Sequence, residues 1–179
     1  MPNFFETLRS AFDTLIDDEP KPPINIIEAS NCWLYYGMIS EAIRFEQVGI
    51  NTTTDDELLG ILVDAEKLCA RQAEKLKKLM RDEGVTLPPV TEEKPNSDPL
   101  QVPPGVKLTD AELSGGLAVK MVAMTSQAAL GAANSVRSDI GMLWVEFLNE
   151  TLAYGMSLKT KMRKRGWAKI PPAFKPPGI

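Results

Sequence analysis

The sequence contains no histidine and only two cysteines among its 179 residues. Without histidine, neither a Ser-His-Asp triad nor a Cys-His nucleophile pair can form. Cys32 and Cys69 lie far apart in the chain, and each falls within a helical apolar pattern. We therefore expect two free thiols that behave as small apolar side chains in a reducing compartment, and no disulfide framework.

Long apolar runs are also missing. The most apolar stretch, residues 117–133, is interrupted by Lys120 and by the polar run 125–127, and it is shorter than the roughly 20 residues that cross a bilayer. Residues 1–18 show no apolar core of a signal peptide. We expect synthesis in the cytoplasm and no membrane partner.

Positive charge is scarce overall, since the formal net charge is −4. No global basic field is present to attract nucleic acid, and we expect no nucleic-acid partner. The charge is uneven, however: residues 1–110 hold 11 Lys/Arg and 20 Asp/Glu, whereas residues 111–179 hold 9 and 4. We interpret the basic run at 159–165 as cations at a helix C-terminus, which the helix dipole favours. An anion-binding or partner-docking patch is the alternative.

Four long helical patterns fill most of the chain. Apolar residues at helical spacing predict helices over 26–48, 55–83, 109 to about 134, and 140–166, with the third boundary placed loosely at 134–138. Thr53 or Thr54 can cap the second helix, and Thr109 with Glu112 forms a capping box for the third. Gly84 and Gly166 are expected at helix C-termini.

The two ends of the chain differ from this pattern. Residues 3–16 read as a short amphipathic helix, and 17–23 as a proline-rich linker, so we separate 1–23 from a bundle domain at 24–179. The C-terminal tail of that domain is again rich in proline. We expect Trp167 and Phe174 to anchor this tail on the bundle.

The first long helix is apolar on two sides. One predicted face consists of Ile27, Leu34, Met38, Ala42 and Phe45; the other consists of Ala29, Trp33, Tyr36, Ile39 and Ile43. A helix that is apolar on both sides must be covered on both. We predict a homodimer interface through Trp33, Tyr36 and Ile43, with the N-terminal helix as the alternative cover.

The segment 86–107 (TLPPVTEEKPNSDPLQVPPGVK) separates the second and third helices and holds six prolines. Helix–helix connections usually take about 2–8 residues. As polyproline II, at about 3.1 Å per residue, this segment reaches roughly 68 Å, which exceeds the roughly 40 Å height of such helices. We predict a packed crossover rather than a flexible linker, and hence an all-α, ferritin-like antiparallel four-helix bundle.

Ferritin-like bundles often hold a di-metal site made of two glutamates and two Glu-x-x-His motifs. The third helix has no carboxylate between Glu112 and Asp139. We predict no metal, no cofactor and no catalytic residue. Six polar residues lie on or beside the core stripes or flank the third turn: Asn31, Glu41, Gln72, Arg137, Asp139 and Glu150. We predict that they form a buried polar layer that satisfies itself; a small-ligand site inside the bundle is the alternative.

Several strings carry a family resemblance. In order, they are GVTLPP (84–89), EKPNSDP (93–99), PPGVKLTDAE (103–112), VRSD (136–139) and RGWAKIPP (165–172). Together they resemble a family from spore-forming Firmicutes whose members are described as spore coat proteins related to coat protein F, with ferritin-like helical domains. Many members are tandem two-domain chains, whereas this chain has one unit. The resemblance covers most of 24–176 and implies a fold and a sporulation context, but no reaction.

From this we expect a non-enzymatic structural or interaction protein, a spore-coat component or coat-associated factor. We expect it to self-associate as a dimer or larger assembly and to contact coat proteins. Two alternatives remain open: a ferritin-like metal or redox protein, and a helical bundle that binds a small molecule or peptide at its basic C-terminal end or at Asn31 and Gln72.

Overall fold

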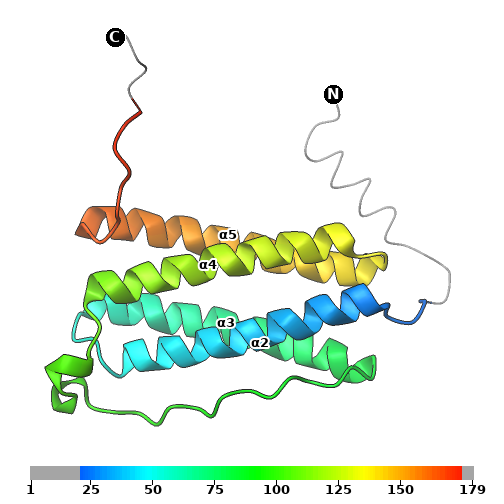
Figure 1. Ribbon diagram of the computed structural model, residues 1–179, viewed down its shortest axis with the longest axis horizontal. Coiled ribbons are helices and arrows are strands. Elements are labelled where there is room, and N and C mark those ends of the chain that lie inside the picture. Colours follow the sequence, from blue (N-terminus) through cyan, green and yellow to red (C-terminus); the bar gives the residue numbers. More distant parts are fainter. Residues whose placement is uncertain (1–20, 175–179) are drawn as a thin grey trace.

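The computed structural model describes residues 21–174, and these fold into an all-α bundle (Figure 1). Its long helices are α2 (Ile26–Ile50), α3 (Asp56–Asp82), α4 (Asp110–Asn134) and α5 (Ser138–Arg165). Two short 3-10 turns, η1 (Pro99–Gln101) and η2 (Pro104–Val106), lie in the connection between α3 and α4. The short helix expected at 3–16 lies outside the described residues. None of the helices within residues 21–174 is long and apolar enough to cross a membrane.

Local capping chemistry sets the helix ends. Thr109 accepts a hydrogen bond from the Glu112 N–H, and the Glu112 carboxylate accepts from the Thr109 N–H, which confirms the predicted capping box. Gly84 and Gly166 adopt left-handed φ values of 71° and 73°, as expected of glycine after a helix end. The expected threonine cap of α3 is wrong, because Asp55 caps this helix and its Oδ1 accepts from the Leu58 N–H at 2.9 Å.

The helices run as two antiparallel hairpins, α2–α3 and α4–α5, with α2 next to α4 and α3 next to α5 (Figure 1). The connection between α3 and α4 runs along the outside of α2 for the full height of the bundle. This arrangement confirms the predicted antiparallel four-helix bundle with a long crossover between its second and third helices.

Polar side chains on α2 fasten the crossover through its main chain. Arg44, Gln47 and Asn51 recur along one edge of α2 and reach the extended segment beside it. Their main-chain partners are Thr91 O (2.9 Å), Lys94 N (3.1 Å), Pro95 O (2.9 Å) and Ser97 N (3.1 Å). The crossover is therefore a packed part of the fold, as predicted, and not a flexible linker.

The rotation of α2 about its axis differs from the prediction. Ile27 and Leu34 are 54% and 52% exposed, although both belong to one of the two predicted apolar faces. The buried stripe instead runs through Cys32, Tyr35, Ile39, Ala42 and Glu46. The error arises because this stripe includes a tyrosine and a glutamate, which a hydropathy pattern does not count as core.

A cluster of three aromatic side chains fills the middle of the core. The Tyr35 and Phe147 rings stack at 5.6 Å between centroids, and the Trp144 ring meets both of them edge-on. Gly131 allows this arrangement, since a Cβ there would lie 2.4 Å from Trp144 Cδ2.

The C-terminal tail is anchored by one aromatic residue instead of two. Trp167 is partly buried and packs against the core, as expected. Phe174 is 86% exposed, and the tail leaves the bundle (Figure 1), so its expected anchoring role is wrong.

Candidate functional site

A chain of polar side chains crosses the bundle from its core to its surface. The Tyr35 hydroxyl donates to Gln72 Oε1 at 2.7 Å, and Gln72 Nε2 donates to Glu150 Oε2 at 2.8 Å. Arg71 closes the outer end, with Nη2 3.6 Å from the other Glu150 oxygen. The structure thus brings together two of the predicted polar residues, Gln72 and Glu150, and adds Tyr35, which the sequence reasoning missed. The buried polar atoms of Tyr35 and Gln72 thus each have a hydrogen-bond partner.

A second polar pair lies deeper in the bundle and was not predicted. Glu46 of α2 and Cys69 of α3 are both completely buried, and the thiol donates toward Glu46 Oε1 at 3.5 Å. Glu46 Oε2 has no hydrogen-bond partner among the residues that the structure describes. Glu46 follows the buried Ala42 by four residues, and this helical spacing could have indicated from the sequence that Glu46 lies on the core face of α2.

Burial dominates the chemistry of this pair. It raises the pKa of Glu46 to about 8, which the Cys69 hydrogen bond and the charge of Lys120 only partly oppose. Burial, with Glu46 close by, also raises the pKa of the Cys69 thiol well above its usual range. At neutral pH both groups are mainly protonated, and a buried neutral thiol is a poor nucleophile. Because both side chains are completely buried, the pair packs within the core.

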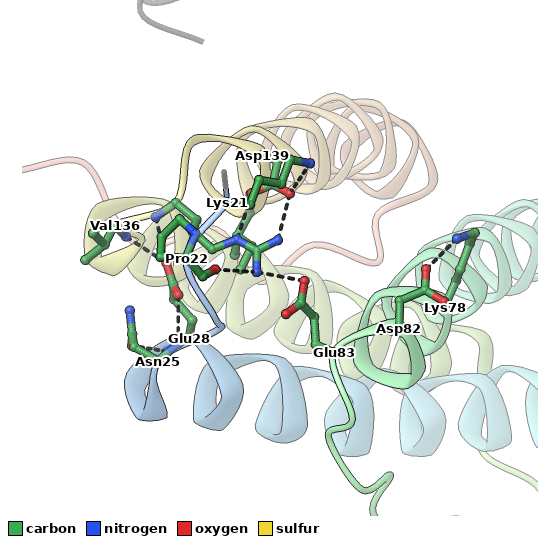
Figure 2. A network of polar contacts seen from close by, with 11 residues as sticks. Lys21, Pro22, Asn25, Glu28, Lys78, Asp82, Glu83, Val136 and Asp139 are labelled. Carbon is green, nitrogen blue, oxygen red and sulfur yellow. Dashed lines mark hydrogen bonds and ion pairs between the residues drawn. The ribbon is translucent and has the colours of Figure 1, made fainter. Parts of the chain in front are cut away.

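Arg137 joins three helix ends at one end of the bundle, and Figure 2 labels its partners Pro22, Glu83 and Asp139. Its guanidinium donates to Asp139 at 3.1 and 2.9 Å and to the Pro22 carbonyl at 3.1 Å, and it pairs with Glu83 at 2.7 Å. The hydrogen bonds from Arg137 hold the pKa of the Asp139 carboxyl well below its usual range. Arg137 and Asp139, both predicted as polar-layer residues, thus belong to a structural junction of α2, α3 and α5.

Glu28 completes this junction and was also missed. It is buried, and its Oε1 accepts from the main-chain N–H groups of Val136 and Arg137, both at 2.8 Å (Figure 2). Its other oxygen accepts from the Asn25 N–H as part of the α2 capping box. One carboxylate therefore caps α2 and also holds the turn between α4 and α5. The Asn25–Glu28 spacing was the only local signal.

The remaining predicted polar residues lie elsewhere. Asn31 is buried, and its Oδ1 accepts from Gln127 Nε2 of α4 at 3.2 Å. Glu41 is exposed and accepts from the Thr91 hydroxyl of the crossover. The six residues therefore do not form one layer, and they do not surround a common cavity.

The residues predicted as an interface also fail to form one outward patch. Trp33 is 43% exposed, but Tyr36 is buried and Ile43 is half-buried. Tyr36 and Ile43 instead line a groove of about 390 Å³ between α2, α3 and the crossover. Arg44, Lys67 and other charged side chains line the same groove.

An uncharged surface lies on α4. Every exposed position of α4 between Leu113 and Ala133 is Val, Ala, Ser or Leu. We call these positions the outer face of α4: Val119, Val122, Ala123, Ser126, Ala129, Leu130 and Ala133. Val119, Val122 and Leu130 are 71%, 54% and 49% exposed. The absence of outward charge along this helix is visible in the sequence.

The comparison with known proteins places the chain in a family. A family model described as "Protein of unknown function (DUF3231)" matches residues 15–178. The chain belongs to this family. A second protein, "Uncharacterized protein YvdQ" of Bacillus subtilis (strain 168), is 25% identical over 150 residues, which cover 84% of this chain and 88% of that protein.

A solved structure confirms the fold of this DUF3231 chain. A crystal structure from Bacillus halodurans C-125, titled as that of a "putative spore coat protein", superposes with a TM-score of 0.83 at 22% identity. The match covers 87% of this chain and 98% of the other. The resemblance to a helical family of spore formers is thereby confirmed.

Within residues 21–174 of this DUF3231 chain, no group of three or more His, Cys, Asp or Glu side chains is placed to hold a metal ion. Its buried polar groups bond mainly to one another or to the main chain. Its outward surfaces, in contrast, include large apolar side chains on α2, α4 and α5. Such an arrangement favours protein–protein contacts.

Proposed function

We propose that this DUF3231 protein is a non-enzymatic structural component of the spore coat or a coat-associated factor. It works through contacts with its own copies and with other coat proteins. The observation that carries the proposal is the contrast between its interior and its surface. Inside, Gln72, Glu28 and Arg137 are all engaged by neighbours within the fold. Outside, α4 presents an apolar, uncharged face that the bundle itself does not cover.

The coat setting is supported by the similar structure from Bacillus halodurans, which is that of a protein named a "putative spore coat protein". It is also supported by the build of the bundle. Polar bonds hold the crossover along α2, and Arg137 and Glu28 lock one end, so the four helices form one well-braced unit. A rigid unit with an exposed apolar face is suited to a protein layer, since the unit loses little conformational entropy when it binds its neighbours in the layer.

Spores of the protein's own host provide the test. An epitope-tagged copy should be recovered with the extracted coat proteins, and immunogold labelling should place it in the coat layer. Deleting the gene should change coat composition, resistance or germination. If the deletion spores match the parent strain in all three, and the tag is found only inside the spore core or in vegetative cells, the coat role is refuted.

A second candidate function is small-ligand binding in the α2–α3 groove. Its volume of about 390 Å³ falls in the usual range of ligand pockets, and it combines Tyr36 and Ile43 with Arg44 and Lys67. Native mass spectrometry of the purified protein tests this candidate: a stoichiometric copurified small molecule would favour binding over a purely structural role. Metal analysis of the same sample tests the metal-dependent alternative, which stoichiometric iron or manganese would favour.

A further inference from the structure

The outer face of α4 has the properties of a contact between identical subunits. It extends over four turns of helix without a charged side chain, whereas exposed helix faces in monomeric proteins are normally charged or polar. Lys120, the only charged residue of α4 between Leu113 and Ala133, turns away: its ammonium lies 4.4 Å from the centre of the Phe45 ring and donates to the Glu41 carbonyl. Lys159 of α5 lies beside this face, in the groove that Val122 and Ser126 also line. Nothing on this face therefore repels a second copy of the same face.

The order of residues on this face is symmetric about Ser126. Each exposed position of α4 in this stretch has an exposed, uncharged counterpart equally far from Ser126 on the other side. If two α4 helices pack antiparallel with Ser126 at the centre, the facing pairs are Val119 with Ala133, Val122 with Leu130, and Ala123 with Ala129. Each outer pair combines a larger with a smaller side chain, and the central Ala123–Ala129 pairs and Ser126 allow the helices to approach closely.

The neighbouring helices widen the patch at the same height. The Asn31–Gln127 hydrogen bond joins α2 to the antiparallel α4, so the exposed Leu34, one turn beyond Asn31, lies beside the middle of α4. On the other side, the exposed Leu152 and Met156 of α5 line a shallow groove together with Val122 and Ser126. The apolar surface is therefore widest close to the centre of the pattern.

We propose that a second copy of this chain docks on the outer face of α4, with the two α4 helices antiparallel about a twofold axis beside Ser126. A twofold contact places one patch against itself, so the patch must be self-complementary in charge and shape. The outer face of α4 meets this condition, whereas the outer face of α3 carries Lys67, Arg71 and Lys78. The proposal deepens the proposed function, because contacts between copies are part of that function.

Sedimentation velocity over protein concentrations from about 1 to about 100 μM tests the contact. The wild type should sediment as a dimer of twice the 19.7 kDa chain mass at the upper end. Val122→Glu should raise the dimer dissociation constant at least about tenfold, because it places a carboxylate opposite Leu130 in an apolar contact. Circular dichroism should match the wild type, since Val122 is exposed. Thermal melting should match it at protein concentrations where both are monomeric, because dimerisation itself stabilises the folded state.

A double variant tests the antiparallel register. Val122→Glu with Leu130→Lys in one chain should restore dimerisation. Each introduced glutamate then faces the introduced lysine of the partner, and the twofold axis makes this pair occur twice in the dimer. Within one chain the two positions are eight residues apart, about 12 Å along the helix, and cannot pair. A wild type that stays monomeric, a Val122→Glu variant that dimerises as well as the wild type, or a double variant as weak as the single one would each overturn the proposal.

This test and the test of the proposed function can fail separately. A protein that is monomeric in solution but recovered with the extracted coat would lose this interface and keep its coat role. A dimer with the expected variant behaviour that is absent from the coat would keep the interface and lose the coat role.

Discussion

Replacing Glu46 with glutamine should make the free energy of unfolding fall less as the pH rises from mildly acidic to mildly alkaline solution. Glu46 is completely buried, and Cys69 donates to its Oε1. The amide keeps that acceptor and the size of the side chain, and it resembles the protonated carboxyl that burial favours. Charged and titratable groups from the other helices surround it: Glu66 and Cys69 on α3, Lys120 on α4 and Tyr154 on α5.

The magnitude follows from proton linkage. The unfolded chain ionises Glu46 above its ordinary pKa of 4.5, whereas the folded protein ionises it only near pH 8. Between these values the unfolded state binds fewer protons, so the stability that Glu46 contributes is full below pH 4.5 and is lost as the pH rises. Between the two pKa values, each pH unit changes the free energy of unfolding by about 1.4 kcal/mol. The free energy of unfolding therefore falls by roughly 3 kcal/mol between pH 5.5 and pH 8 because of Glu46.

Urea unfolding of the wild type and Glu46→Gln at pH 5.5, 7 and 8 measures this difference. The free energy of unfolding of the variant, relative to the wild type, should rise by about 3 kcal/mol across the series. Glu74→Gln is the matched control, because the Glu74 side chain is 72% exposed and should show no such trend. Parallel pH profiles for Glu46→Gln and the wild type would refute a protonated buried Glu46.

Three further predictions concern the core and the junction. Gly131→Ala should lower the free energy of unfolding in urea by about 1–3 kcal/mol, because its Cβ would collide with Trp144. The control is Gly60→Ala, whose Cβ meets open space and which should raise the free energy of unfolding by about 0.5–1 kcal/mol. Equal effects of the two substitutions would contradict the packing argument. Arg137→Met should cost about 2–4 kcal/mol and lower the melting temperature, because it removes the ion pairs of Arg137 with Glu83 and Asp139; an unchanged melting temperature would refute the junction. The Asp139 pKa is depressed, so its stabilisation is present above about pH 4 and lost as the pH falls; acid titration monitored by circular dichroism should show a shallower loss for Asp139→Asn.

The sequence predicted the parts of the fold that depend on local chemistry. The Thr109–Glu112 capping box and the glycines at 84 and 166 set helix ends through contacts within a few residues, and each was identified. The crossover was identified from its length and proline content, because a segment of that size has few alternatives next to helices of this height. The order of the helices followed from the lengths of their connections.

The candidate site was harder to predict, because its contacts join distant parts of the chain. Glu28 bonds to main-chain atoms more than a hundred residues away, and no local pattern identifies that partner. Glu46 was overlooked because a carboxylate is costly to bury and is normally assigned to the surface. Gln72 and Glu150 were both among the six predicted polar residues, but their contact with each other was not predicted. The spacing of residues along two helices does not tell how far one helix is shifted along its axis relative to the other.

The way the crossover is fastened has a consequence for how this protein can vary. Arg44, Gln47 and Asn51 recognise carbonyl and amide groups of the segment beside them, and every amino acid except proline supplies both. These contacts therefore do not depend on which side chains the crossover carries, provided that the segment stays extended. Its length is not free, because an insertion or deletion would shift every contact along α2. Between diverging relatives, this stretch should accept few gaps.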